Sequence, residues 1–167
     1  MSIKIAILTV SDRSFRGERE DLSGPALQAE VSALGWQVAR AEIVPDEVDA
    51  IAATLAEWAD SGLADVILTS GGTGFAPRDV TPEATRRVVE RLTPGLDEAI
   101  RSASLKVTQH AMLSRAVSGI RKRTLIVNLP GSPRGVVETL AVIAPVLPHA
   151  VELLRESRDA EQGHRSI

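Results

Sequence analysis

The stretch TSGGTGFAPRDVTPEAT, residues 69–85, carries three glycines within four positions and then an Arg, an Asp and two prolines. Missing side chains let backbone N–H groups approach an anion closely, whereas a tight turn alone explains one glycine. The chain contains no Gly-Lys-Ser or Gly-Lys-Thr, which excludes a Walker A loop, and Pro77 stands where a dinucleotide fingerprint needs its third glycine. We therefore interpret residues 70–74 as a phosphate-binding loop of another kind, with a purely structural turn as the alternative.

On both sides of this loop, apolar runs of strand length alternate with segments of helical period, which is typical of an α/β fold with a largely parallel sheet. The predicted strands are residues 3–10, 37–44, 65–69 and 124–129. The predicted helices are residues 23–35, 47–61, 81–91, 96–106 and 134–155, with Pro145 and Pro148 breaking or kinking the last one. Residues 107–123 are ambiguous, and we expect a short helix near 108–113 and a partial strand around 117–120 there.

Capping residues mark several of the predicted helix ends. Ser23 is the expected N-cap of the first helix, and Thr81 is the expected cap of the helix that follows the glycine loop. Gly35 and Gly62 stand where the first two helices should stop. These signals predict where the helices begin and where the first two end.

Two aspartates are candidates for a metal site beside the glycine loop. Asp46 follows the second predicted strand and Asp79 follows the glycines, and ligands of open α/β sheets bind beyond the carboxyl ends of the strands. Each aspartate alone could be a carboxylate at a helix start, Asp46 as an N-cap and Asp79 stabilised by the helix dipole. Together, beside a phosphate site, they supply what Mg²⁺ needs. Both interpretations stay open on the residues alone.

Two further loops follow predicted strands. The loop SDRSFRGEREDLSG, residues 11–24, holds many charges, and a solvated loop is the favoured interpretation for residues 16–20. Its candidates for polar contacts at the mouth of the site are Ser11, Asp12, Asp21, Ser23 and Gly24. The loop NLPGSP, residues 128–133, turns sharply into a helix and is a possible anion or ribose contact.

The composition excludes several classes of protein. With no cysteine, the chain has no disulfide framework, thiolate zinc site or cysteine nucleophile, and His110, His149 and His164 are too far apart in sequence for a local ligand pair, so we assign them no role. The net charge of −3 and the four aromatic residues do not favour nucleic-acid binding. Prolines interrupt the apolar segment 136–154, and residues 3–10 are too short for a signal peptide core. We expect a cytoplasmic protein that binds neither nucleic acid nor membrane.

Five segments in the same order resemble the molybdopterin adenylyltransferase family, which includes the bacterial Mog and MoaB proteins and the G domains of gephyrin and its plant counterpart. The segments are SDRSFRGEREDLSG, IVPDEV, GGTGFAPRDVTPEAT, MLSRAVSGIR and LIVNLPGSP. The resemblance implies a three-layer αβα sandwich with a mostly parallel sheet. It also implies a homotrimer or hexamer. From length and composition we expect one domain over residues 1–156 and a polar tail over 157–167.

The reaction that this resemblance implies joins AMP from ATP to the terminal phosphate of molybdopterin and releases pyrophosphate. Mg²⁺ is the expected cofactor, ATP the co-substrate, and a separate metal insertase a possible partner. Because the phosphate nucleophile arrives with the substrate, the protein needs no activated Ser or Cys and mainly positions two anions. A non-catalytic molybdopterin carrier or an oligomeric scaffold of the same fold is the alternative function.

Carried over position by position, the resemblance makes Asp46 and Asp79 the Mg²⁺-binding, catalytic acids. Some MoaB-type members lack the first acid, so its presence here favours an enzyme. Ser104 and Ser114 match serines of the pterin and nucleotide sites, although a serine by itself is more often a cap or a surface hydroxyl. The residues expected to bind substrate or nucleotide are Ser11, Asp12, Ser23, Gly24, Ser70, Gly71, Gly72, Thr73, Gly74, Pro94, Gly95, Ser104, Ser114, Arg115, Asn128, Pro130, Gly131 and Ser132. Asp97 and Glu98 depart from the pattern by adding negative charge after the Pro-Gly pair.

Overall fold

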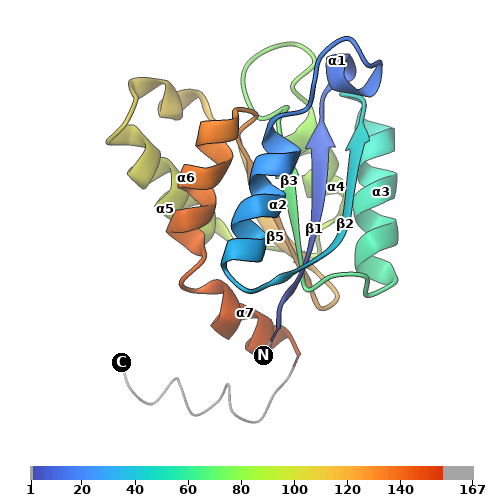
Figure 1. Ribbon diagram of the computed structural model, residues 1–167, viewed down its shortest axis with the longest axis vertical. Helices are drawn as coiled ribbons and strands as arrows, with labels where there is room; N and C mark the ends of the chain where they lie inside the picture. Colours follow the sequence, from blue (N-terminus) through green and yellow to red (C-terminus); the bar gives the residue numbers. More distant parts are fainter. Residues whose placement is uncertain (1, 156–167) are drawn as a thin grey trace.

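A sheet with a mostly parallel strand arrangement forms the middle of the molecule. The computed structural model describes residues 2–155, and over these residues the sheet has six strands in the order β2-β1-β3-β6-β5-β4 (Figure 1). The strands are β1 (Lys4–Val10), β2 (Gln37–Val44), β3 (Val66–Ser70), β4 (Arg91–Leu92), β5 (Ser118–Arg121) and β6 (Thr124–Leu129). The neighbours β2, β1, β3 and β6 are parallel, while β5 runs antiparallel to both β6 and β4. The predicted α/β class with a mostly parallel sheet is confirmed.

Helices cover both faces of this sheet, which gives three layers (Figure 1). They are α1 (Asp12–Phe15), α2 (Ser23–Ala33), α3 (Val48–Asp60), α4 (Thr81–Val88), α5 (Pro94–Leu105), the 3₁₀ helix η1 (Gln109–Leu113), α6 (Pro133–Ile143) and α7 (Leu147–Leu154). Apolar residues of α2, α5, α6 and α7 pack on one face, and those of α3 and α4 pack on the other. The loops that follow the parallel strands therefore meet at one edge, where the sheet changes winding direction between β1 and β3.

The central strands are buried on both faces, as the continuous apolar runs predict. Ile5 and Ile7 of β1 join the cluster under α2 and α6, whereas Ala6 and Leu8 join the cluster under α3. All four side chains are fully buried. This double burial fixes the strand register, because a slip by one residue would exchange the two faces.

Two of the predicted helix ends are confirmed, and three predictions of boundaries are wrong. Gly35 and Gly62 have positive φ values of 76° and 67° just after α2 and α3. Ser23 is the first residue of α2 and does not cap it, because Asp21 accepts the hydrogen bond from the Gly24 N–H instead. Thr81 also lies inside its helix. That helix ends at Val88, before the unpredicted strand β4.

Other boundaries follow the sequence more closely. The predicted break near the prolines is confirmed, since α6 ends at Ile143 and α7 begins at Leu147 with a bend of 66° between them. The four-residue helix α1 was not predicted. Residues 156–167, the expected polar tail with His164, lie outside the described residues. Over residues 2–155 no single helix is long and apolar enough to cross a membrane, and α6 with α7 reaches that length only as the bent pair.

Asn128 links three elements in the interior and has no exposed surface. Its Nδ2 donates to Thr69 Oγ1 of β3 at 3.0 Å and to Thr85 Oγ1 of α4 at 2.9 Å, and its Oδ1 accepts from the Val117 N–H at 3.2 Å. The side chain thus holds α4 and the start of the β5 hairpin against the sheet.

Replacing Asn128 should be costly for stability. Asn128→Leu keeps the approximate shape but leaves three buried polar groups without their partner, so we expect the free energy of unfolding to fall by about 3 kcal/mol. Thr124→Val, which removes one buried hydrogen bond to the Ala64 carbonyl, is the control and should cost about 1 kcal/mol. Urea unfolding measures both, and equal losses would contradict the cross-linking role of Asn128.

Candidate active site

The glycine loop passes so close to its neighbours that side chains would not fit. Gly71 and Gly72 have φ values of 97° and 67°. A Cβ on Gly71 would lie 2.4 Å from the carbonyl oxygen of Val10, and a Cβ on Gly72 would lie 2.3 Å from Thr81 Oγ1. Positive φ and close approach both require glycine at these positions. The loop therefore touches the end of β1 on one side and the start of α4 on the other.

Hydrogen bonds hold this loop on both sides. The Gly71 N–H donates to the Leu129 carbonyl at 3.2 Å, and Thr81 Oγ1 donates to the Gly71 carbonyl at 2.9 Å. The Thr81 N–H donates to the Gly72 carbonyl at 3.1 Å. Thr81, predicted from sequence as a helix cap, thus fixes the glycine loop to the first turn of α4.

The two candidate acids lie against different glycines of the loop, Asp46 at Gly72 and Asp79 at Gly74. Asp46 Oδ1 is 3.2 Å from the place a Cβ on Gly72 would occupy, and Asp79 Oδ2 is 2.9 Å from the corresponding place on Gly74. The predicted N-cap role of Asp46 is wrong, because Glu47 is the N-cap of α3 and Asp46 Oδ2 accepts from the Asp12 N–H at 2.8 Å. Asp79 Oδ2 accepts from the Ala76 N–H at 3.0 Å and does not cap α4.

The electrostatic state of Asp46 points to a shortage of positive charge. Burial raises the pKa of Asp46, and the charges of Asp12 and Asp79 raise it further, while Arg78 acts in the opposite direction. Within residues 2–155, Asp46 Oδ1 accepts no hydrogen bond. A half-buried carboxylate with a free oxygen, close to a second carboxylate, fits a divalent cation.

The protein supplies too few ligands to complete a cation site alone. Among residues 2–155 no three His, Asp or Glu side chains gather in a way that could hold a metal ion. Mg²⁺ commonly binds through one or two carboxylates together with substrate phosphates and water. Asp46 and Asp79 therefore fit a cation that arrives with a phosphate substrate better than a permanently bound structural metal.

An ion pair connects the loops that carry Asp12, Asp46 and Arg78. Asp12 and Asp46 exchange hydrogen bonds, since each backbone N–H donates to the carboxylate of the other at 2.8 and 3.0 Å. Arg78 donates to both Asp12 oxygens, at 2.5 Å from Nε and 3.0 Å from Nη2, and this lowers the pKa of Asp12. Sequence reasoning did not single out Arg78, because its partner lies 66 positions away.

A small polar hollow of about 140 Å³ adjoins the glycine loop. Ser70 Oγ donates to Ser23 Oγ at 2.8 Å and approaches the Pro130 carbonyl at 3.1 Å. Asp21 accepts from Thr9 Oγ1, Ser23 Oγ and the Gly24 N–H. The predicted site residues that line the hollow are Ser11, Ser23, Ser70, Gly71 and Gly131. The structure thus brings together the loops after β1, β3 and β6, as their positions at strand ends predicted.

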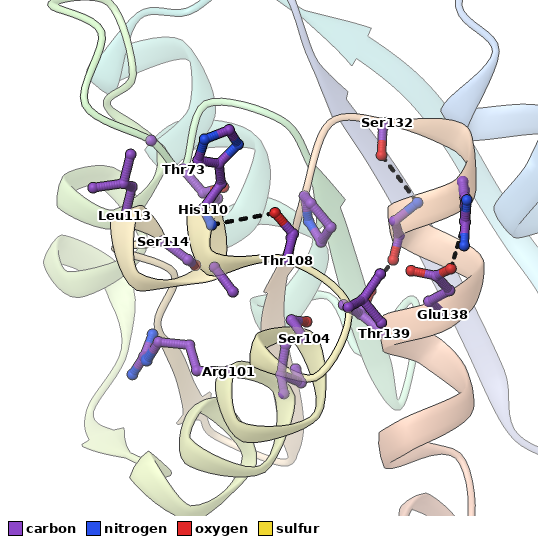
Figure 2. A pocket seen from close by; sticks show the side chains of 17 residues that line it. Thr73, Arg101, Ser104, Thr108, His110, Leu113, Ser114, Ser132, Glu138 and Thr139 are labelled. Atoms are coloured by element: carbon purple, nitrogen blue, oxygen red, sulfur yellow. Dashed lines mark hydrogen bonds and ion pairs between the residues drawn. The ribbon is translucent and has the colours of Figure 1, made fainter.

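A cavity of about 410 Å³ opens between α5, η1 and α6 (Figure 2). Because it exceeds the polar hollow in volume, we call it the larger cavity. Figure 2 shows Ser104 of α5 and Thr139 of α6 on opposite sides of this cavity. The predicted site residues that line it are Thr73, Gly74, Ser104, Ser114, Pro130 and Ser132. Gly74 lines this cavity and lies against Asp79, so the cavity adjoins the second of the two acids.

Sequence reasoning missed several residues of this cavity. The cavity is lined by Thr108, the N-cap of η1, and by His110 within η1. Arg134 and Thr139 line it from α6. His110 had been assigned no role, because the sequence shows no second residue near it in a recognisable pattern. The only signal for Arg134 in the sequence is its place at the start of a helix with an apolar stripe, where a polar side chain can point toward a site.

Other predicted site residues lie away from the larger cavity. Asn128 is buried in the interior, and Gly95 lines neither the hollow nor the larger cavity. Pro94 and Arg115 line a separate cavity of about 430 Å³, together with Asp97 and Arg101. The structure therefore places most of the predicted binding residues in two neighbouring cavities around the glycine loop and a third cavity beyond it. The predicted binding residues that line none of the three are Asp12, Gly24, Gly72, Gly95 and Asn128.

Asp97 is buried, so it does not add negative charge at a phosphate site. Only 6% of Asp97 is exposed, its Oδ2 accepts from the Ser118 N–H at 3.0 Å, and its Oδ1 has no hydrogen-bond partner in the described chain. Burial raises the pKa of this carboxyl. The sequence predicted extra negative charge because Asp97 is acidic, but it does not show which face of α5 carries this residue.

Comparison with known proteins agrees with this geometry. Residues 6–149 match the family described as "Probable molybdopterin binding domain". The molybdopterin adenylyltransferase of Helicobacter pylori strain J99 is 43% identical over 155 residues, which cover 92% of this chain and 88% of that protein. The molybdenum cofactor synthesis protein cinnamon of Drosophila melanogaster is 47% identical over 157 residues, 92% of this chain, but the chain spans only 26% of that protein. The crystal structure of the molybdopterin biosynthesis enzyme MoaB of Thermus thermophilus superposes with a TM-score of 0.87 at 50% identity, covering 93% of this chain and 98% of that one.

The close packing of Gly72 can be separated from its backbone strain. Gly72 and Gly62 share a φ of 67°, but a Cβ on Gly62 would meet nothing within 4 Å. We expect Gly62→Ala to cost about 1 kcal/mol of unfolding free energy from the left-handed conformation alone. Gly72→Ala should cost at least about 2 kcal/mol more, because Thr81 Oγ1 must move and lose its bond to Gly71. Urea titrations measure the unfolding free energies of both variants. Equal losses would show that the close contact at Gly72 does not contribute to the cost of the substitution.

The buried Asp97 should make stability depend on pH. A folded-state pKa raised above the unfolded value gives stability that is present at low pH and is lost as the pH rises through the folded pKa. Asp97→Asn keeps an acceptor for the Ser118 N–H and removes the buried charge. We expect this variant to be more stable than wild type at neutral pH, with the difference shrinking as the pH falls through the raised folded pKa and reaching its minimum at the unfolded pKa of about 4. Chemical unfolding at several pH values tests this, and a difference independent of pH would rule it out.

Proposed function

The chain belongs to the molybdopterin-binding domain family, and we propose that it is a molybdopterin adenylyltransferase of molybdenum cofactor biosynthesis. The resemblance read from the sequence is confirmed by relatives of that name at 41–44% identity over most of the chain. In the proposed reaction, AMP passes from ATP to the terminal phosphate of molybdopterin, and pyrophosphate leaves. The same proposal includes the cytoplasm as the place of the reaction, as the sequence leads us to expect.

The observation that carries this proposal is the pair of carboxylates held around the glycine loop at the border of the larger cavity. Asp46 lies against Gly72, Asp79 lies against Gly74, and Gly74 lines the cavity. A cavity of about 410 Å³ lies within the usual range for small-molecule sites, and several hydroxyl groups on its wall could orient a polar ligand. The polar hollow beside Ser70 and Gly71 is the proposed place of a phosphate of the nucleotide.

The residues of the chain position two anions for an in-line displacement. An oxygen of the terminal phosphate of molybdopterin forms a bond to the α-phosphorus of ATP, and the bond from that phosphorus to the oxygen bridging to the β-phosphate breaks. The Gly71 N–H already donates to the Leu129 carbonyl, so the part of the glycine loop that orients the phosphates is residues 72–74, where the two glycines leave the backbone N–H groups unshielded. A phosphate oxygen at neutral pH is already ionised, so no side chain has to remove a proton.

The repulsion between the two anions and the acid pair must be offset by a cation. Mg²⁺ bound by Asp46 and Asp79 would supply that positive charge next to the phosphates. The raised pKa of Asp46 supports this role, since an added cation would favour its charged form. A homotrimer, or a hexamer, and transfer of the product to a separate insertase are part of the same proposal and come from the family resemblance.

The acid pair provides the direct test of this function. We expect Asp79→Asn and Asp46→Asn each to lower kcat for pyrophosphate release about 100-fold or more, because each removes charge that binds the cation beside the reacting phosphates. Molybdopterin affinity should stay within about twofold, since neither acid lines the larger cavity. Turnover is followed by coupled detection of pyrophosphate, and pterin binding by its fluorescence.

Asp49→Asn is the matched control, because Asp49 lies on α3 with an exposed side chain paired to Arg87. It should leave turnover unchanged. If Asp79→Asn keeps full turnover and only lowers thermal stability, Asp79 has a structural role and the catalytic assignment is wrong. If wild type binds pterin but forms no AMP adduct, the chain is a carrier.

A further inference from the structure

Arg115 donates hydrogen bonds to the glycine loop and to the backbone of Asp79, the second acid. It lies between η1 and β5, and its backbone N–H donates to the Thr73 carbonyl at 2.8 Å. Its Nε donates to the Gly74 carbonyl at 2.7 Å, and its Nη2 donates to the Asp79 carbonyl at 2.5 Å. Its Nη1 pairs with Glu83 of α4. One side chain thus spans the whole segment from the glycines to the first turn of α4.

The segment between these contacts has little support of its own. Residues 75–78 are exposed, and the Phe75 side chain at the tip is 67% exposed. Inside the segment, Asp79 and Ala76 exchange hydrogen bonds with each other, which shapes the turn but does not fix it to the sheet. Arg78 fastens the tip to Asp12, and Arg115 fastens the two ends. Beside the Thr81 contacts at the start of α4, these two arginines therefore help to set the position of Asp79 relative to Asp46.

The geometry of the contact suits arginine in particular. The guanidinium is planar and presents donors in several fixed directions, so one group can reach two carbonyl oxygens and a carboxylate at once. A lysine ammonium at the end of a flexible stem could satisfy only part of this set. Because Glu83 balances its charge, Arg115 adds little net positive charge that a substrate phosphate could use.

The surroundings of Arg115 also separate it from substrate. Its neighbour Ser114 lines both the larger cavity and the separate cavity between α4 and α5, whereas Arg115 lines only the separate one. The sequence assigned Arg115 to substrate or nucleotide binding, and its contacts with the loop favour a different role.

We propose that Arg115 is the positioning residue of Asp79: by holding the carbonyls of Gly74 and Asp79 it sets the placement of Asp79 opposite Asp46, and so the affinity of the site for a divalent cation. The inference rests on the proposed function in taking these two acids as a shared cation site. Supporting groups of this kind typically change metal affinity or activity by 10–100-fold. Arg115 acts through Asp79 and does not contact the reacting atoms.

The test measures cation binding directly as well as turnover. Mn²⁺ is titrated into the full-length chain with ATP present, and free Mn²⁺ is followed by electron paramagnetic resonance. We expect Arg115→Ala to weaken Mn²⁺ binding about tenfold or more and to lower kcat by a similar factor, with molybdopterin affinity within about twofold of wild type. Arg115→Lys should recover part of both losses. Glu83→Gln, which removes the ion pair but keeps both carbonyl contacts, is the control and should remain close to wild type.

Two results would overturn the inference. If Arg115→Ala weakens molybdopterin or ATP binding and leaves Mn²⁺ affinity unchanged, Arg115 is a substrate contact. If it lowers the melting temperature and leaves Mn²⁺ affinity unchanged, its role is structural only. Should Arg115→Ala not fold, Arg115→Lys decides the same question by the same titration. A wild-type chain that binds Mn²⁺ but makes no AMP adduct would contradict the proposed function while leaving the role of Arg115 measurable.

Discussion

The close approach of Gly71 to the carbonyl of Val10 determines the arrangement of the whole candidate site. With a φ of 97° and no side chain, Gly71 brings the end of β3 against the end of β1, and the next residue then lies between Thr81 and Asp46. The contacts of the glycine loop with Thr81 and Asp46 build on that placement, because a side chain on Gly71 would push the loop after β3 away from the end of β1. The backbone conformation of Gly71 thus helps to position the loop against which Asp46 and Asp79 lie.

Holding carboxylates together has an electrostatic cost that the fold offsets only in part. Asp12 is neutralised by Arg78, which lowers its pKa, whereas burial and neighbouring charge raise the pKa of Asp46. An incompletely compensated acid beside a cavity is typical of a functional site, since structure alone gains nothing from it. The same imbalance explains why such a site would bind a cation most strongly when phosphates complete the coordination.

Much of the fold and part of the site follow from local patterns in the sequence. Strand runs, helix periods and the glycines that end α2 and α3 act over a few residues, and the loops at strand ends predicted where polar side chains meet. Capping was less predictable, because the Thr81 hydroxyl could bond either its own helix or the Gly71 carbonyl, and only the tertiary structure decides. The roles of Arg78 and Arg115 depend on partners 66 and 36 positions away, which no local pattern reveals. The burial of Asp97 depends in the same way on how α5 packs.

The central claim is that the two acids and the glycine loop serve the transfer of AMP to a phosphate of molybdopterin. A single-turnover experiment with ATP labelled at the α-phosphate, molybdopterin and Mg²⁺ tests it most directly. The account predicts that the label appears on the pterin product in equal amount with released pyrophosphate. Label that remains in ATP, or in ADP with the γ-phosphate transferred to the pterin, would contradict it.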